Sequence, residues 1–187
     1  MKPKIETRTD IINYFIRKYR YRSYLEIGYL GGENFNRITC ARKDSVDINP
    51  ETEAKYKMSS DRFFKQCTRK YDIIFIDGNH SQRQVGRDIR NSLKHLSKRG
   101  TIVLHDCNPP TERWQKWNGT VWRAVLYLRQ RCEWITIRTV EIDHGVGIIR
   151  RERTFRYRKK ISTFYKFDIH RSKVLNLISP DQFLKIY

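Results

Sequence analysis

Apolar and polar residues alternate along the first 150 residues in two different periods. Nearly continuous runs of β-forming residues predict six strands, at 23–28, 44–48, 71–77, 101–105, 134–140 and 146–150. Apolar residues at helical spacing predict five helices, at 7–21, at 33–38, from Ser59 to Cys67, from Ser81 to Gly100 and at 121–130. Residues 108–118 contain two prolines and are predicted to form a polar loop.

Local signals mark the ends of several helices. Thr7 with Asp10, and Ser81 with Gln84, have the spacing of capping boxes. The second of these helices is expected to end at Lys98-Arg99-Gly100, with cations in its last turn and a glycine after it.

The order of these elements predicts the fold class. Strands that alternate with helices are typical of an α/β protein with a mostly parallel sheet and helices on both faces. The last two strands are separated only by residues 141–145, too few for a parallel crossover, so they are predicted to form a C-terminal antiparallel hairpin.

The alternation stops at residue 150, which divides the chain into a predicted domain, 1–150, and an extension, 151–187. The extension is basic and contains Phe155, Tyr157, Phe164, Tyr165 and Phe167. Such a segment could form an added helix, a dimer arm or a partly ordered tail, and its aromatic residues favour packing against another surface. Its role is left open.

Composition limits the protein class and its compartment. The 187 residues are 39% hydrophobic and 13% aromatic, which indicates one folded domain. No apolar run approaches the roughly 20 residues that span a bilayer, and the N-terminus lacks the apolar stretch of a signal peptide. The four cysteines show no zinc-like spacing and are expected to be reduced thiols, so a cytoplasmic location is predicted. Cys107 is the one cysteine whose position makes reactivity worth testing.

A formal net charge of +19 is the main compositional anomaly. It could attract nucleic acid, anionic lipid or a phosphorylated substrate, or it could simply be a solvated basic surface.

Polar side chains gather at the predicted carboxyl ends of four strands. Gly28 ends the first strand near Glu26, Asp47 ends the second, Asp77 the third and His105-Asp106 the fourth. Ligands of doubly wound sheets bind beyond this edge, where a glycine turn admits the ligand and an acid 19 residues later can bind ribose hydroxyls.

Three segments carry a resemblance to a known family. Residues 25–32 (LEIGYLGG) resemble the first motif of class I methyltransferases that use S-adenosylmethionine. Residues 76–81 (IDGNHS) and 100–110 (GTIVLHDCNPP) resemble segments of a bacterial small-molecule O-methyltransferase subgroup. The resemblance covers about residues 10–150. It implies a Rossmann-like fold, S-adenosylmethionine as cofactor and a methyl acceptor that is a small molecule with a hydroxyl group, such as a sugar, a natural product or a phenol.

The resemblance also implies roles for individual residues. Those expected to bind the cofactor are Glu26, Gly28, Gly32, Asp47, Met58, Ser59, Asp61 and Asp77. Metal-dependent members place oxygen ligands at the positions of Asp77, His105 and Asp106, so a magnesium or manganese ion is a candidate second cofactor. Here a histidine stands in place of one acid, which makes an all-oxygen magnesium site less well matched.

His80 and His105 are the candidate general bases, together with Asp77 at the reaction centre. A neutral imidazole can accept the proton of a hydroxyl as the methyl group is transferred. Trp114, Trp117 and Trp122 could line an acceptor pocket, cover the cofactor or only pack the loop.

Two other functions remain as alternatives. The charge and the aromatic residues of the extension would suit an RNA methyltransferase. That reading is not favoured, because no N-P-P-Y-type motif follows the strand that ends at Asp77. The second alternative is a non-catalytic protein that binds S-adenosylmethionine. The sequence also leaves open whether the protein forms a homodimer.

Overall fold

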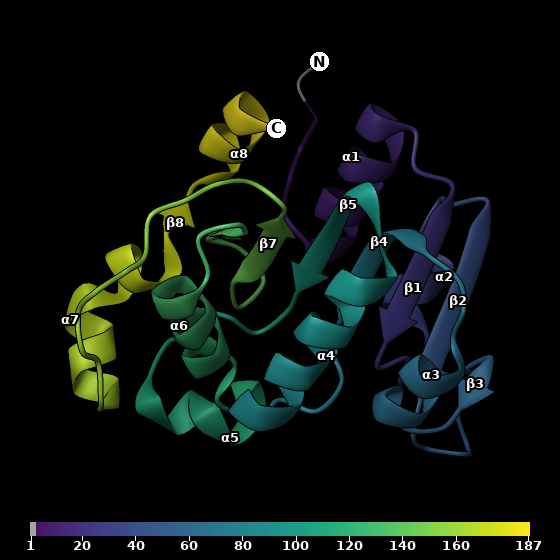
Figure 1. Cartoon of the computed structure of the whole chain (residues 1–187), viewed down its shortest axis with the longest axis horizontal. Helices are drawn as coiled ribbons and strands as arrows, with labels where there is room; N and C mark the ends of the chain where they lie inside the picture. Colours follow the sequence, from purple (N-terminus) through teal and green to yellow (C-terminus); the bar gives the residue numbers. More distant parts are fainter. Residues whose placement is uncertain (1–2) are drawn as a thin grey trace.

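The computed structural model describes residues 3–187, which form a three-layer α/β arrangement around one mixed sheet (Figure 1). The sheet contains β1 Ser23–Ile27, β2 Arg42–Asp47, β3 Tyr56–Lys57, β4 Tyr71–Ile76, β5 Leu96–Leu104, β6 Thr136–Val140, β7 Val146–Arg150 and β8 Leu177–Ile178. The helices are α1 Arg8–Tyr19, α2 Glu33–Asn36, α3 Ser60–Gln66, α4 Gln82–His95, α5 Gln115–Asn118, α6 Val121–Arg131, α7 Phe164–Leu175 and α8 Pro180–Ile186.

The strand order is β3-β2-β1-β4-β5-β7-β6-β8. The first five strands of this order pair in parallel, β7 runs antiparallel to β5, and β6 and β7 form the predicted antiparallel hairpin. The order reverses at β1, which lies between β2 and β4, and ligand sites of such sheets lie at that switch point.

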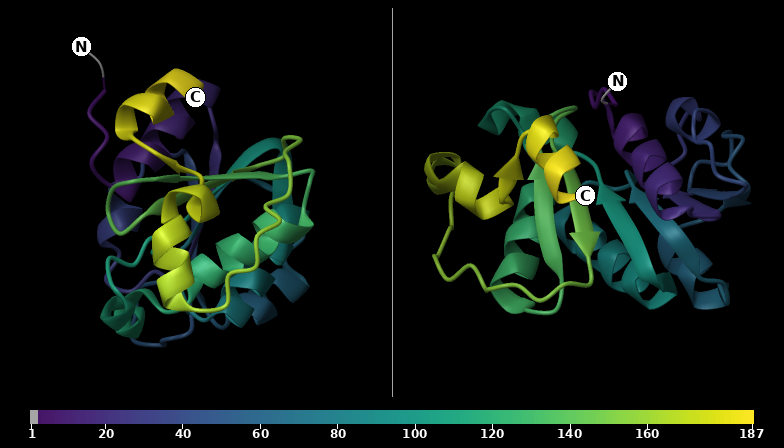
Figure 2. Two further views of the ribbon diagram at one scale, coloured as in Figure 1. Left: turned by 90° about the vertical axis from the view of Figure 1, so that its left-hand side faces the viewer. Right: turned by 90° about the horizontal axis from the view of Figure 1, so that it is seen from above.

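Two hydrophobic cores lie on opposite faces of the sheet (Figure 2). Neighbouring residues of β4 alternate between them: Ile74 and Ile76 pack against the helices α3, α4, α6 and α7, whereas Ile73 and Phe75 pack against α1 and α8. This period of two follows from the pleat of a strand and explains why β4 reads as a continuous apolar run.

The α1 capping box forms as predicted, because Thr7 and Asp10 satisfy each other's backbone N–H groups. At α4 only half of the predicted box forms. The Ser81 hydroxyl accepts from the backbone N–H of Gln84, but the Gln84 amide donates to Ser60 and Asp88 instead.

The predicted end of α4 at Gly100 is wrong. The helix ends at His95, and β5 begins at Leu96, which is fully buried and pairs with Tyr71 of β4. Burial of Leu96 therefore outweighs the local helix-end signal. Gly100 lies inside the strand, where a Cβ atom would come within 2.7 Å of the Asp72 carbonyl oxygen.

The loop at 108–118 contains more structure than predicted, namely a 3₁₀ turn, η1 Glu112–Trp114, followed directly by α5. The hairpin strand at 146–150 is also not the last strand. After an irregular segment, residues 164–187 form α7, β8 and α8, and β8 pairs in parallel with β6. Phe167 and Phe183 of these helices are fully buried, one in each core.

Candidate functional site

A cavity of about 670 Å³ opens at the carboxyl ends of β1, β2 and β4, beside the residues that follow β5. Most of the residues predicted for the site line it: Glu26, Gly28, Asp47, Met58, Ser59, Asp77, His80, His105 and Asp106. Two predicted cofactor residues, Gly32 and Asp61, do not line it. Gly32 is the N-cap of α2, and the Asp61 carboxylate pairs with Arg87 at 3.2 Å.

The turn after β1 is held by Asp47. One of its carboxylate oxygens accepts the backbone N–H groups of Tyr29 and Leu30, both at 2.9 Å, and the other accepts that of Asn49 at 2.8 Å. Gly28 has a φ of +91°, and a Cβ atom there would lie 2.2 Å from the Asp77 carbonyl oxygen. The glycine is therefore required for close packing of two backbone segments, in addition to any approach of a ligand.

Glu26 is almost completely buried beneath this turn. Its carboxylate accepts hydrogen bonds from the Tyr24 hydroxyl and, at 2.8 Å, from the Asn34 amide, which in turn accepts from Thr9 at 2.8 Å. Burial raises the pKa of Glu26 to about 7, although both hydrogen bonds work against the shift. Glu26 is thus a carboxyl group that titrates near neutrality at the wall of the cavity.

A second buried acid, Asp88, also lines the cavity, as do Met58 and Ser59. One of its oxygens accepts from Ser60 at 2.6 Å and from Gln84 at 3.0 Å. Burial raises the pKa of Asp88. Sequence reasoning missed Asp88, although an acid between Val85 and Ile89 on the apolar face of α4 was a usable signal.

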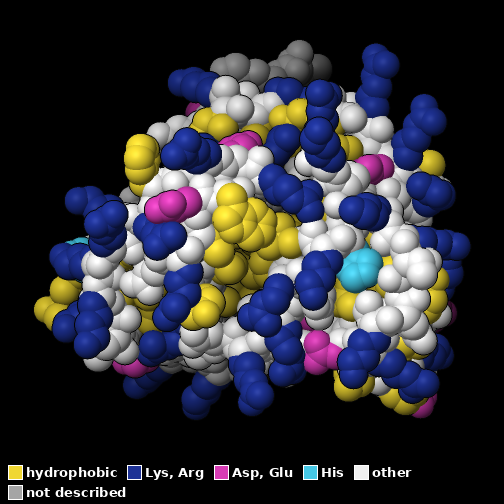
Figure 3. All heavy atoms as spheres, viewed as in Figure 1, with side chains coloured by type: hydrophobic (Ala, Val, Ile, Leu, Met, Phe, Trp, Pro, Cys, Tyr) yellow, Lys and Arg dark blue, Asp and Glu magenta, His cyan; other side chains and the backbone are white. Residues whose placement is uncertain are grey.

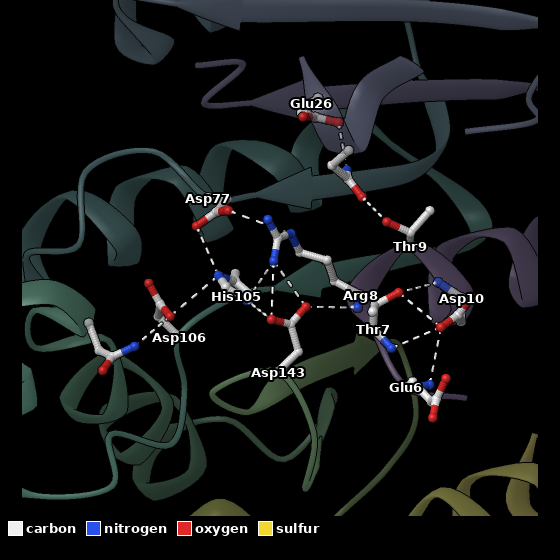
Figure 4. Close-up of polar contacts among 12 residues, drawn as sticks. Glu6, Thr7, Arg8, Thr9, Asp10, Glu26, Asp77, His105, Asp106 and Asp143 are labelled. Carbon is white, nitrogen blue, oxygen red and sulfur yellow. Dashed lines mark hydrogen bonds and ion pairs between the residues drawn. The ribbon is translucent and has the colours of Figure 1, made fainter. Parts of the chain in front are cut away.

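His105 lies within a cluster of carboxylates (Figure 4). Its Nδ1 lies 3.2 Å from Asp77 and 3.3 Å from Asp106, and its Nε2 lies 3.3 Å from Asp143. Burial alone would lower the pKa of His105, but hydrogen bonds to Asp143 and Asp77 raise it to about 10. A charged imidazole with carboxylates at both nitrogens has no lone pair with which to accept a proton or bind a metal ion.

Arg8 adds a second cation to this cluster. Its guanidinium donates to Asp143 at 3.0 Å, and its Nε lies 4.0 Å from Asp77. Hydrogen bonds from His105 and from the Arg8 backbone N–H, reinforced by charge attraction to both residues, hold the pKa of Asp143 well below its usual range despite partial burial. Neither Arg8 nor Asp143 was predicted, because they lie near the start of α1 and in the β6–β7 turn, and only the fold brings them to the ends of β4 and β5.

His80 occupies a different position, in the loop between β4 and α4 just before the N-cap Ser81. Its Nδ1 lies 2.7 Å from the Trp117 carbonyl oxygen, and its Nε2 lies 3.3 Å from Asp77. The hydrogen bond to Asp77 raises the pKa of His80, against burial. Its side chain remains 29% exposed and lines the cavity, so an acceptor hydroxyl can reach it.

The candidate metal ligands differ from the predicted set. Ligand atoms of Asp77, His80 and Asp106 all lie within 4.8 Å of one another, so His80 takes the place predicted for His105. One nitrogen and two carboxylates suit manganese, iron or zinc better than magnesium.

Cys107, the cysteine singled out for reactivity, is fully buried behind this edge of the sheet. Burial raises its pKa, which keeps the thiol protonated and unreactive. All four cysteines are free thiols.

The charge of the cavity is opposite to that of the chain. Lys and Arg side chains cover much of the face shown in Figure 3, and the net charge is +19. The cavity, by contrast, is lined by two cations, Arg8 and the charged His105, and by six acids, Glu26, Glu33, Asp47, Asp77, Asp88 and Asp106. The cavity therefore favours a cationic ligand over an anionic one.

Proteins of known structure share the fold described above. Residues 32–107 match a family model described as a methyltransferase domain. The structure of cofactor-bound Rv0187 from MTB has a TM-score of 0.63 and 12% identity, covering 82% of this chain and 84% of that one. An O-methyltransferase from Bacillus cereus, solved with S-adenosylhomocysteine, has a TM-score of 0.58 and 13% identity over 80% and 82%.

A third structure contains a metal ion. The MycE methyltransferase of mycinamycin biosynthesis was solved with magnesium, S-adenosylhomocysteine and mycinamycin VI, and has a TM-score of 0.50 and 16% identity over 75% of this chain and 48% of that one. No protein of curated function matches the sequence. At these identities the structural likeness establishes the fold.

Proposed function

We propose that this chain is a class I methyltransferase that uses S-adenosylmethionine, and that it methylates a hydroxyl group of a small-molecule acceptor. The observation that carries the proposal is the acidic cavity at the switch point of the sheet in a strongly basic chain. S-adenosylmethionine, when bound, supplies a methyl group on a positively charged sulfur, and both its sulfonium and its ammonium groups suit such a cavity.

The residues of the cavity divide between the two ends of this cofactor. Glu26 and Asp77 lie near the turn after β1 and would face the methionine end. Asp47 would accept the ribose hydroxyls with the lone pairs that Tyr29, Leu30 and Asn49 leave available. Met58 and Asp88 would border the adenine, the first by apolar contact and the second by accepting from its amino group.

Proton transfer is assigned to His80. As the new carbon–oxygen bond forms, the acceptor hydroxyl loses its proton, and the old carbon–sulfur bond leaves its electron pair on sulfur. His80 is exposed to the cavity, and in its neutral form the Nδ1–H donates to the Trp117 carbonyl, which leaves the lone pair on Nε2 to receive that proton; Asp77, 3.3 Å from Nε2, then pairs with the imidazolium. His105 and Arg8 instead hold Asp77, Asp106 and Asp143 in position.

A divalent cation would be held by Asp77, His80 and Asp106, and would acidify the acceptor hydroxyl.

No helix in residues 3–187 is long and apolar enough to cross a membrane. Four free thiols support the reducing cytoplasm as the compartment.

Calorimetric titration with S-adenosylmethionine tests the cofactor site. We expect dissociation constants in the micromolar range for the intact protein and at least tenfold weaker binding for Asp47→Ala, since that change removes the ribose acceptor and loosens the turn. Asp61→Ala is the matched control, because Asp61 lies nearby but pairs with Arg87 outside the cavity. The proposal would be refuted if the folded protein did not bind S-adenosylmethionine, or if both variants lost affinity for it equally.

A further inference from the structure

A second cavity of about 630 Å³ is lined by Arg113, Trp114, Lys116 and Trp117. These residues belong to η1 and α5, the short helical segments at the lower edge of Figure 1. The lining consists of two cations and two indoles and contains no acid, so the charge of this cavity is opposite to that of the first.

The second cavity adjoins the reacting groups. The carbonyl oxygen of Trp117 lies 2.7 Å from Nδ1 of His80, and the amide of the next residue, Asn118, donates to Asp106 at 2.5 Å. The Trp114 ring packs on His144 with centroids 5.0 Å apart. The segment that lines this cavity therefore contacts His80 and Asp106, which line the first one.

The segment is anchored, so its side chains form a built surface. Gln115 of α5 accepts a hydrogen bond at 3.2 Å from the indole N–H of the fully buried Trp122. The backbone N–H of Thr120 donates at 2.8 Å to the carbonyl oxygen of His80. Contacts on both sides of Trp117 thus fix its backbone.

The two cations that line the cavity form no ion pair within the described residues, and both indoles are partly exposed. Neither Arg113 nor Lys116 forms an ion pair with an acidic side chain of residues 3–187, according to the contacts within 4.0 Å. Trp114 is 40% exposed and Trp117 is 75% exposed. Exposed tryptophans beside unpaired cations indicate a ligand that covers the rings and neutralises the charge.

We propose that this second cavity is the acceptor subsite and that the acceptor is a ring compound carrying a carboxylate or phosphate group. The ring packs on Trp114 and Trp117, the anionic group pairs with Arg113 and Lys116, and the hydroxyl reaches His80. This inference rests on the proposed methyl transfer and adds the chemical class of the acceptor. The two cavities would then separate a cationic cofactor from an anionic acceptor by charge.

Matched pairs of probes test the charge requirement. Protocatechuate is compared with its methyl ester, and glucuronate with glucose, by calorimetry on the protein alone and saturated with S-adenosylhomocysteine. We expect the anionic member of at least one pair to bind about tenfold or more tightly than its neutral counterpart. Equal binding within every pair, or no binding by either anionic probe, would overturn the inference.

A double variant locates the effect. Arg113→Gln with Lys116→Gln is expected to remove the preference for the anion, whereas Arg153→Gln with Lys159→Gln is expected to keep it. The second pair lowers the net charge equally at exposed positions that do not line either cavity. Loss of the preference in both variants would assign it to the overall charge and refute the subsite.

The cofactor titration separates this inference from the proposed function. Both double variants should bind S-adenosylmethionine as the unmodified protein does, because no altered residue lines the first cavity. Failure to bind the cofactor would refute methyl transfer while the anion preference could still be measured on the protein alone. Normal cofactor binding without an anion preference would refute only the subsite.

Discussion

Individual residues at the carboxyl ends of the parallel strands have roles that differ from those implied by their motifs. Asp77 and His105 were both predicted to lie at the reaction centre, and the fold does bring them together, at 3.2 Å. Three carboxylates then fix His105 as a buried cation, while His80, three residues after Asp77, keeps access to the cavity. Position on a strand end therefore did not decide which histidine can exchange protons.

Glu26 is expected to make the stability of the protein depend on pH. Its pKa is raised to about 7, so between about pH 4.5 and 7 the folded state holds a proton that the unfolded state has lost. The free energy of unfolding should consequently fall as pH rises through this window and level off above it. Glu26→Gln, which keeps an oxygen to accept from Tyr24 and Asn34, should remove this dependence.

Urea unfolding of both proteins at pH 5 and pH 8 measures this effect. We expect the variant to gain on the order of 2–3 kcal/mol relative to the original chain between the two pH values. Parallel pH profiles would show that Glu26 is not the titrating group.

His80→Gln is expected to lower kcat about 100-fold or more with little change in the dissociation constant of S-adenosylmethionine, because proton acceptance is lost and the cofactor contacts remain. His95→Gln is the control, since His95 caps carbonyl oxygens at the far end of α4. Initial rates with and without EDTA complete the test. Activity that survives EDTA assigns proton acceptance to His80 alone, whereas activity restored only by manganese makes His80 a ligand.

At the scale of elements, the C-terminal segment completes the sheet and both cores. Its aromatic residues fall into buried and exposed sets. Phe167 of α7 is fully buried and stacks on Trp122 of α6 with ring centroids 4.3 Å apart, while Tyr165 is 74% exposed. Trp122 is one of the buried residues of α6 and also donates to Gln115 of α5, so this packing connects α7 to the segment that carries the proposed acceptor subsite.

Phe167→Ala is expected to lower the free energy of unfolding by about 3–5 kcal/mol, because it removes a buried ring and leaves a cavity beside Trp122. Tyr165→Ala on the same helix should change it by less than about 0.5 kcal/mol. Chemical denaturation followed by tryptophan fluorescence measures both. Similar effects of the two substitutions would show that α7 does not pack on α6 in solution.

At the scale of the whole molecule, charge is distributed unevenly. The chain carries a net charge of +19, with many cations on the face shown in Figure 3, while acids line the first cavity, so repulsion among the cations opposes the compact state. This repulsion is screened by salt over distances of about 10 Å at 0.1 M.

Raising NaCl from about 20 mM to 300 mM should therefore raise Tm by about 2–4 °C, corresponding to on the order of 1 kcal/mol. KCl at equal ionic strength should act equally if screening is the cause. Differential scanning calorimetry provides the measurement, and a Tm that falls or stays constant with salt would contradict a destabilising surface charge.

The sequence by itself determined the parts of this protein that depend on local chain chemistry. Periodicity located four strands of the parallel sheet but not the two-residue β3, and a five-residue gap required the hairpin. Acidic and glycine residues at the strand ends indicated the edge where the cavity lies. These features were readable because strand pleating, turn chemistry and helix capping act between residues close in the chain.

Tertiary structure alone decided the features that join distant segments. Leu96 entered the core and shortened α4, and residues 164–187 added β8 to a sheet that already looked complete. Arg8 and Asp143, 135 residues apart, met His105 and fixed its charge. The physical reason is that burial and charge pairing depend on neighbours in space. Neither the pKa of a histidine nor the sign of the charge that lines a cavity is therefore a property of the local sequence.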